Sequence, residues 1–350
     1  MTSVDRRNFI ALGASAAVLP VASASVMESG PIARFESLDI SKSVEDNLIG
    51  QYLMPVRVSV AVGAERPFSA LHFSDAHVCM ADAADMLSTG IRDLRLYEMR
   101  NNPATRRIGV GLGIGMFAVQ SLAAAIAYAR RKGMPLLNTG DIIDFRSEAN
   151  YACVAHSLEG VDVFSSLGNH EGRGLHTDSL NPRSREESDV IRLRMEQSLR
   201  QPLIVHSRVI NGVKFVAFDN CGLSHYYRND QFARIKAEFE ENLPTVLMCH
   251  MPPFSEELHE AKCENGRKSG LGRPAAHNLG AYYMMDRPFE KTGASEPLKR
   301  ILDFLRGRKN LKAILCGHAH MEWHGFFGDG VPVHLAGPCF DGECLEVEFI

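Results

Sequence analysis

Short apolar runs alternate with longer, more polar segments along this chain of 350 residues. Residues 56–62 (VRVSVAV) are apolar at every second position, and residues 68–77 (FSALHFSDAH) follow after a turn, so we expect a hairpin that leads into the core. Residues 116–133 are rich in alanine and end in basic residues and Gly133, which predicts a helix. Apolar strands that alternate with helices are typical of an α/β fold.

Five of the apolar runs end in a loop that carries Asp, Asn or His. These loops contain Asp75 and His77, Asp141 and Asp144, Asn169 and His170, His250, and His318 and His320. Open α/β sheets place their active sites at the carboxyl ends of strands. A single Asp at a strand end usually caps a turn or a helix, but five such loops in one chain are hard to attribute to coincidence.

In this order, the loops resemble those of the calcineurin-like metallophosphoesterase superfamily. Its pattern is D-x-H, G-D-x-x-D, G-N-H-E, H and G-H-x-H, and the segments SDAH, GDIID, GNHE, CHMPP and GHAH carry every motif residue. The resemblance runs from about Leu71 to the C-terminus. It implies a four-layer α/β/β/α sandwich, with two mixed β-sheets flanked by helices, that hydrolyses a phosphomonoester or a phosphodiester.

The residue types in these loops point to divalent metal ions. Carboxylate, amide and imidazole ligands without thiolate suit Mn, Fe, Zn or Ni. Seven ligands are too many for one tetrahedral ion, whereas two ions about 3.5–4 Å apart would use them all. The resemblance implies that one ion is held by Asp75, His77, Asp141 and His320, and the other by Asp141, Asn169, His250 and His318. Seven such groups without a metal would be costly to bury.

Two further residues have expected roles in the reaction. His170 directly follows a ligand, so its ring could donate a proton to the leaving oxygen. Asp144 matches the family aspartate that pairs with this histidine, which would fix the ring and favour its protonated form. The alternative for Asp144 is a cap on the following segment. Asp144 in place of the Tyr of purple acid phosphatases argues against a tyrosinate-bound iron, and Glu171 is expected only to support the ligands.

The expected reaction is attack of a metal-bridging hydroxide on phosphorus. One alternative is a non-catalytic, metal-containing protein that binds a phosphorylated ligand. Another is a surface-interaction protein whose metals only stabilise the fold. Loss of His170 or of a bridging ligand would mark a non-catalytic relative, and both are present.

The first 24 residues resemble a bacterial twin-arginine export signal. They contain Arg6 and Arg7, an apolar stretch over residues 9–21, and the small-residue site Ala22-Ser23-Ala24. The alternative, an uncleaved anchor, is disfavoured because about 20 apolar residues are needed to span a bilayer and Pro20 interrupts this shorter run. We therefore expect a periplasmic or extracellular protein without stable membrane insertion after cleavage. The expected organisation is a signal peptide (1–24), an N-terminal extension (25–54) and a metallophosphoesterase domain (55–350).

The net charge of the chain bears on which kinds of partner it can bind. The net charge of -4 argues against an obligate nucleic-acid partner but is compatible with a small phosphorylated substrate, and it leaves the oligomeric state open.

The Asp341-Gly342 dipeptide predicts a hairpin that would set Cys339 opposite Cys344. The two cysteines could form a disulfide, but we favour two reduced thiols. Residues 109–115 (GVGLGIG) lack phosphate-loop spacing and suggest a mobile loop.

Residues 262–287 read as a long polar loop. Arg267, Lys268 or Arg273 in this loop could meet a substrate phosphate. Ordinary solvated surface is the alternative for each of these three basic residues.

Overall fold

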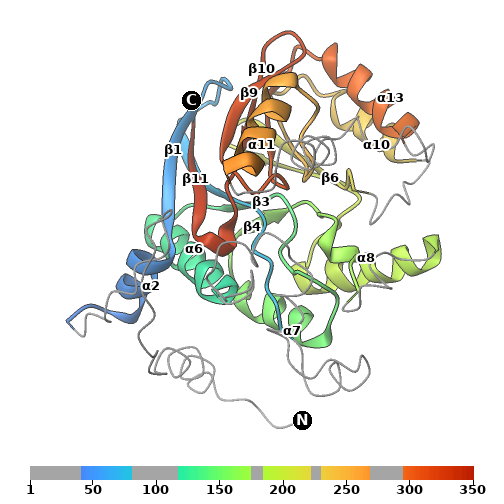
Figure 1. Ribbon diagram of the computed structural model, residues 1–350. Coiled ribbons are helices and arrows are strands. Elements are labelled where there is room, and N and C mark those ends of the chain that lie inside the picture. The colour runs from blue at the N-terminus through green and yellow to red at the C-terminus, as the bar shows by residue number, and fades with distance from the viewer. Residues whose placement is uncertain (1–40, 81–116, 175–183, 222–229, 269–294) are drawn as a thin grey trace.

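The computed structural model describes residues 41–80, 117–174, 184–221, 230–268 and 295–350. These residues form two mixed β-sheets that pack face to face, with helices on both outer faces (Figure 1). The predicted four-layer α/β/β/α architecture is therefore confirmed. Among the described residues, no helix is sufficiently long and apolar to cross a bilayer.

The first sheet has five strands in the order β1-β11-β2-β3-β4. Their bounds are β1 (Met54–Val60), β11 (Glu343–Phe349), β2 (Phe68–Phe73), β3 (Leu136–Asn138) and β4 (Val163–Ser165). The predicted hairpin between β1 and β2 is wrong, because β11 lies between them, parallel to β1 and antiparallel to β2. With one strand between them, β1 and β2 lie about 10 Å apart at the usual strand spacing, and the linker of residues 61–67 spans this distance.

The second sheet has six strands in the order β5-β6-β7-β8-β10-β9. Their bounds are β5 (Val205–Ile210), β6 (Val213–Phe218), β7 (Thr245–Met248), β8 (Leu311–Cys316), β10 (Val331–Leu335) and β9 (Trp323–Phe327). β6, β7, β8 and β10 run parallel, and the edge strands β5 and β9 are antiparallel to their neighbours. β6 is buried along its whole length, as expected for a strand covered on both faces.

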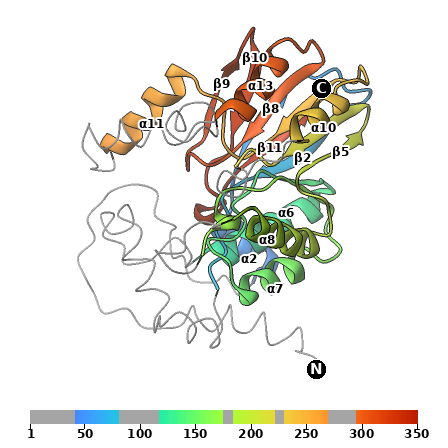
Figure 2. The same ribbon diagram turned by 90° about the vertical axis from the view of Figure 1, so that its right-hand side faces the viewer.

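Three apolar cores separate the four layers. The inter-sheet core contains Phe215 of β6 and Phe349 of β11. The core under the five-stranded sheet is closed by α2 (Val44–Tyr52), α6 (Ala118–Lys132), α7 (Glu148–Ser157) and α8 (Arg185–Leu199). The core on the other side is closed by α10 (Gln231–Glu238), α11 (Glu256–Lys268) and α13 (Ser295–Arg306). Figure 2 shows the two groups of helices on opposite sides of the sheets.

Two predicted segments differ in the structure. Cys339–Asp341 forms a 3₁₀ turn, η4, instead of a hairpin, because Gly342, with φ of 86°, caps it through a bond from its N–H to Cys339 O. Cys344 lies in β11 opposite Pro55, so the two cysteines do not face each other in a hairpin, and both are free thiols. The predicted loop at residues 262–287 is helical up to Lys268, where α11 ends.

The predicted helix at residues 116–133 is observed as α6, which ends at Gly133 in the left-handed conformation. Within the predicted N-terminal extension, α2 is tied to α6 by an ion pair of 2.8 Å between Asp46 and Arg131. The domain boundaries stay a prediction. The export signal, residues 109–115 and Arg273 lie outside the described residues.

Candidate metal centre

All five predicted loops follow the carboxyl ends of strands, and they come from both sheets. β2, β3 and β4 supply three loops from the first sheet, and β7 and β8 supply two from the second. The 3₁₀ helix η2 (His170–Gly172) begins directly after Asn169. The two sheets therefore bring residues that are far apart in sequence to one place between their ends.

The backbone of these loops adopts an uncommon conformation. Five predicted ligands have positive φ: Asp75 (54°), His77 (46°), Asp141 (52°), His318 (68°) and His320 (48°). Among the described non-glycine residues, only Arg200 and Asn211 share this feature. Such residues carry a conformational cost that persists at functional sites when the surroundings hold them in place. The loops therefore aim these side chains at the expense of local stability.

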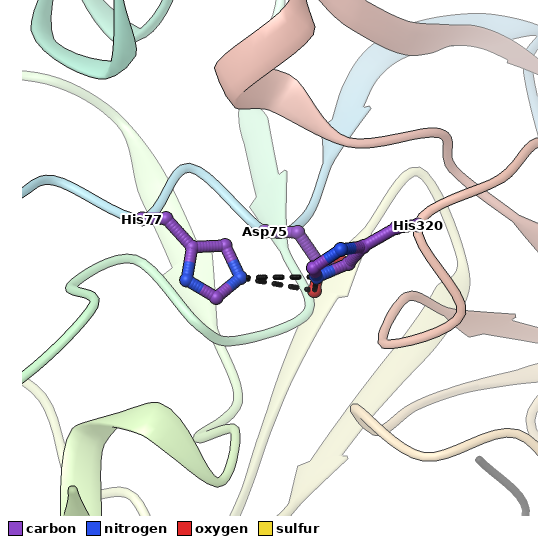
Figure 3. A group of neighbouring side chains, drawn as sticks. All are labelled: Asp75, His77 and His320. Carbon is purple, nitrogen blue, oxygen red and sulfur yellow. Dashed lines mark hydrogen bonds and ion pairs between the residues drawn. The ribbon is translucent and has the colours of Figure 1, made fainter. Parts of the chain in front are cut away.

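One group of side chains consists of Asp75, His77 and His320 (Figure 3). His320 Nε2 lies 3.1 Å from His77 Nε2 and 3.2 Å from Asp75 Oδ1. The other oxygen of Asp75, Oδ2, accepts a bond of 2.8 Å from the His318 N–H. That backbone bond fixes the carboxylate, so Oδ1 faces the two imidazoles.

The second group consists of Asp141, His250 and His318. His250 Nε2 lies 3.0 Å from both Asp141 Oδ2 and His318 Nδ1. His250 Nδ1 is 2.8 Å from the carbonyl oxygen of Thr139, so it must carry the proton and donate, which leaves Nε2 as a ligand atom. Asp141 Oδ1 accepts a hydrogen bond of 2.7 Å from the backbone N–H of His170. A backbone N–H therefore fixes the carboxylate of Asp141, as it does that of Asp75.

These donors fit divalent cations. In each group, two ring nitrogens lie about 3 Å apart and share a hydrogen bond, and a cation could take the place of the proton between them. Among the predicted ligands, two buried oxygens accept no hydrogen bond within the described structure: Asp75 Oδ1 and Asn169 Oδ1. Unpartnered buried oxygens are costly, and a metal ion would satisfy both. Asn169, the one predicted ligand outside the two groups, therefore presents the atom expected of a ligand.

The pKa values follow from this crowding. Burial raises the pKa of Asp75 and Asp141, but the neighbouring imidazoles outweigh burial and hold both below the usual value. Burial lowers the pKa of His77 and His250, but nearby carboxylates outweigh it and raise these values to about 10 and about 9. A divalent ion would compete with those protons for the same nitrogens.

His170 and Asp144 form a third group with His77 of the first group. His170 Nδ1 is 2.9 Å from both the carbonyl oxygen and Oδ1 of Asp144. Asp144 Oδ1 is also 3.0 Å from His77 Nδ1, so one carboxylate contacts two imidazoles. Burial raises the pKa of Asp144, but bonds from His170 and His77 outweigh it and keep the pKa well below its usual value. Ser147, not Asp144, caps the next helix, α7.

Sequence reasoning did not find Arg173. Its Nη1 lies 3.3 Å from His170 Nδ1 and 3.7 Å from Asp144 Oδ1, and its side chain is 25% exposed. A basic residue three positions after the predicted acid was the available signal. The guanidinium adds positive charge beside the His170 ring.

Glu171 has a larger structural role than expected. Its buried carboxylate accepts backbone N–H groups from Gly168 at 2.6 Å, Ile142 at 2.7 Å and Asp141 at 3.1 Å. It therefore ties the loop after β4 to the loop after β3. Burial raises the pKa of Glu171 to about 7.

Sequence reasoning also did not find Lys262 of α11. Its ammonium group donates to the carbonyl oxygen of Ala319, which lies between two predicted ligands in the sequence.

Comparison with solved structures finds distant likenesses in fold. A dimetal phosphatase from Danio rerio is 11% identical over 78% of this chain and 88% of that chain, with a TM-score of 0.41. A phosphopantetheinyl hydrolase from Mycobacterium tuberculosis is 14% identical over 78% and 90%, with a TM-score of 0.36. A 5′-nucleotidase from Staphylococcus aureus, described as putative, is 15% identical over 78% of this chain and 49% of that chain, with a TM-score of 0.39.

Comparison with curated proteins gave no match. A family model, described as calcineurin-like phosphoesterase, matches residues 68–322. This range includes all five loops and both groups of side chains. Since the match covers well over half of the sequence, the chain belongs to the calcineurin-like phosphoesterase family.

Proposed function

We propose that this protein hydrolyses phosphate esters of small molecules with two divalent metal ions held by the five loops. The observation that carries the proposal is the position of the Asp141 carboxylate. Its Oδ2 lies 3.0 Å from His250 Nε2 in one group and 3.7 Å from His77 Nε2 in the other. A carboxylate shared by two groups of ligands is the arrangement expected for a pair of ions.

The proposed ligands are Asp75, His77, Asp141 and His320 for one ion, and Asp141, Asn169, His250 and His318 for the other. Mn, Fe, Zn and Ni all suit this mixture of oxygen and imidazole donors. When bound, such ions would neutralise charge on the phosphate and make an attacking water more acidic. Family membership supports metal-dependent phosphoester hydrolysis in general.

The residues beside the ligands divide the remaining tasks. Because Asp144 holds His170 through Nδ1, Nε2 is the atom that can donate a proton to the leaving oxygen. Arg173 would bind a non-bridging phosphate oxygen, since its guanidinium lies within 3.4 Å of the same ring. Asp144 thus orients the acid while it fixes the ligand His77.

A turnover assay on metal-depleted protein tests the proposal. Chelation should abolish hydrolysis of nitrophenyl phosphate, and added Mn²⁺ should restore it, because the ligands bind exchangeable ions. Elemental analysis of the same samples gives the ions per chain. Full activity in metal-free protein would contradict the metal mechanism, and metal-loaded protein inactive on nucleotides, sugar phosphates and phospholipid head groups would favour a binding protein.

We also propose that residues 1–24 direct export by a twin-arginine route and are then removed. The support is the order of the arginine pair, the apolar stretch and the small residues up to Ala24. Intact mass of the exported protein should correspond to an N-terminus near Ser25. A mature protein that retains Met1 to Ala24 would refute the cleavage.

A further inference from the structure

A separate pair of histidines lies on the hairpin formed by β9 and β10. His324 of β9 and His334 of β10 are direct cross-strand partners. Their Nδ1 atoms are 2.9 Å apart, and their ring centroids are 5.0 Å apart. β9 is the edge strand of the six-stranded sheet, so the pair lies at one edge of that sheet. Neither residue belongs to the five metal-centre loops.

The neighbour of His324 determines which nitrogen carries its proton. Glu322 Oε1 lies 3.0 Å from His324 Nε2, and an ionised carboxylate can only accept. Nε2 must therefore donate, which leaves the Nδ1 lone pair of the neutral ring facing His334. A carboxylate behind one ring nitrogen and a lone pair on the other is the usual arrangement of a metal-binding histidine, and here an ion would replace the hydrogen bond between the two Nδ1 atoms.

The spacing between the two Nδ1 atoms suits a shared ion. With metal–nitrogen distances of about 2.0–2.1 Å, adjacent ligands lie about 2.9 Å apart at a right angle and about 3.3 Å apart in a tetrahedron. The observed 2.9 Å therefore needs little or no movement of the strands. The His324 side chain is 36% exposed, so an ion can enter from solvent and keep water as its remaining ligands.

We propose that His324 and His334 form a second metal site, separate from the catalytic centre, for a divalent transition metal such as Ni²⁺, Cu²⁺ or Zn²⁺. Imidazole pairs favour these ions over Mg²⁺ or Ca²⁺. With two protein ligands, the site is weaker than the centre formed by the five loops. A bound ion would link the edge strand β9 to β10 and resist fraying of that edge.

Metal counting on matched variants tests the site. Full-length protein, stripped with chelator, is dialysed against Ni²⁺ and analysed for nickel per chain. His324→Gln and His334→Gln should each bind one ion fewer than the unmodified protein, and Glu322→Gln should bind that ion more weakly. His156→Gln, which alters an exposed histidine of α7, should bind the same number as the unmodified protein. Equal counts in all proteins would overturn the proposal.

A second measurement needs no variant. Diethyl pyrocarbonate modifies accessible imidazoles, and mass spectrometry of peptides locates each modified residue. Ni²⁺ should slow modification of His324 and His334 but not of His156, because only the pair shares an ion. Equal rates with and without Ni²⁺ would mean that the two rings share only a hydrogen bond, and the site would be refuted.

Discussion

The Asp144 carboxylate serves two imidazoles with one oxygen, and this sharing ties the proposed acid to the metal centre. Oδ1 lies 3.0 Å from His77 Nδ1 and 2.9 Å from His170 Nδ1, and the two rings meet edge to face at 4.4 Å. A ligand and an acid that share one carboxylate cannot move independently. Changes at His170 can nevertheless be separated from changes at a ligand, because His170 is in neither proposed ligand set.

We expect His170→Ala to keep its metal and to lose rate. Loss of a general acid should slow the chemical step by about 10²–10⁴-fold. The loss should be far greater for alkyl phosphates than for nitrophenyl phosphate, because nitrophenolate leaves without a proton. Rates on both esters, with metal content on the same sample, check this expectation.

His250→Ala is the matched control for the acid. It removes a proposed ligand, so metal content and activity on every ester should fall together. If His170→Ala also loses metal, or slows both kinds of ester equally, His170 is not the general acid.

Arg173 should discriminate between substrates by charge. A guanidinium bond to a charged oxygen contributes about 1.5–3 kcal/mol, so Arg173→Ala should lower kcat/KM about 10–100-fold for a phosphomonoester dianion. The loss should be smaller for a diester, which carries one charge fewer. Nitrophenyl phosphate and bis-nitrophenyl phosphate make the comparison, with Arg194→Ala on the surface of α8 as control. An equal loss on both esters would argue against direct contact with the phosphate.

At the level of elements, the loops approach one another too closely for larger residues. A Cβ on Gly317 would overlap Ser74 Oγ and lie 2.5 Å from Asp75 Oδ2. A Cβ on Gly168 would lie 2.5 Å from the Asp141 backbone nitrogen. The glycines of the GNHE and GHAH motifs therefore allow ligand-bearing loops from different strands to touch.

We expect Gly317→Ala to damage the site more than the fold. Overpacking should cost about 1–3 kcal/mol and displace Asp75, so metal content should fall. Gly307→Ala is the control, because its Cβ would meet only Phe304 O at 3.8 Å. Thermal unfolding and metal content are measured on both. A Gly317→Ala protein with its full metal content would show that the loop can yield.

Local patterns predicted the elements better than their arrangement. The strand-end loops and α6 were predictable, because each depends on a short stretch such as the basic end and Gly133 of the helix. The position of β11 was not predictable, because its pairing with β1 and β2 joins distant segments. Arg173 was missed for a similar reason: only the folded loop brings its guanidinium onto the His170 ring.

At the scale of the molecule, three histidines of the described residues that lie outside the metal centre are held neutral mainly by burial. Burial lowers the pKa of His72 to about 3 and that of His206 and His334 to about 4. In the unfolded chain these rings take up protons near pH 6.5. Their contribution to stability is therefore complete above pH 6.5 and is lost as the pH falls toward 4.

The substitution His206→Gln should flatten this dependence. His206 packs against Phe164 with ring centroids 4.6 Å apart. Between pH 7.5 and 4.5, the variant should lose about 2–3 kcal/mol less unfolding free energy than the unmodified protein. Urea denaturation at both pH values measures this difference, with His156→Gln as the exposed control. Parallel curves for all three proteins would exclude a role for His206.

The position of β11 has a consequence for synthesis. A ribosome makes β1 and β2 long before residues 343–349, so the position between these two strands stays open until β11 has been made. Until then, both strands present unpaired backbone groups that can join other chains. The Asp75 loop also lacks two of its backbone hydrogen bonds during this time, because Cys339 N–H bonds to Ser74 O at 2.9 Å and Phe340 N–H bonds to Asp75 O at 3.2 Å. The proposed metal centre can therefore be completed only after residues 339 and 340 have been made.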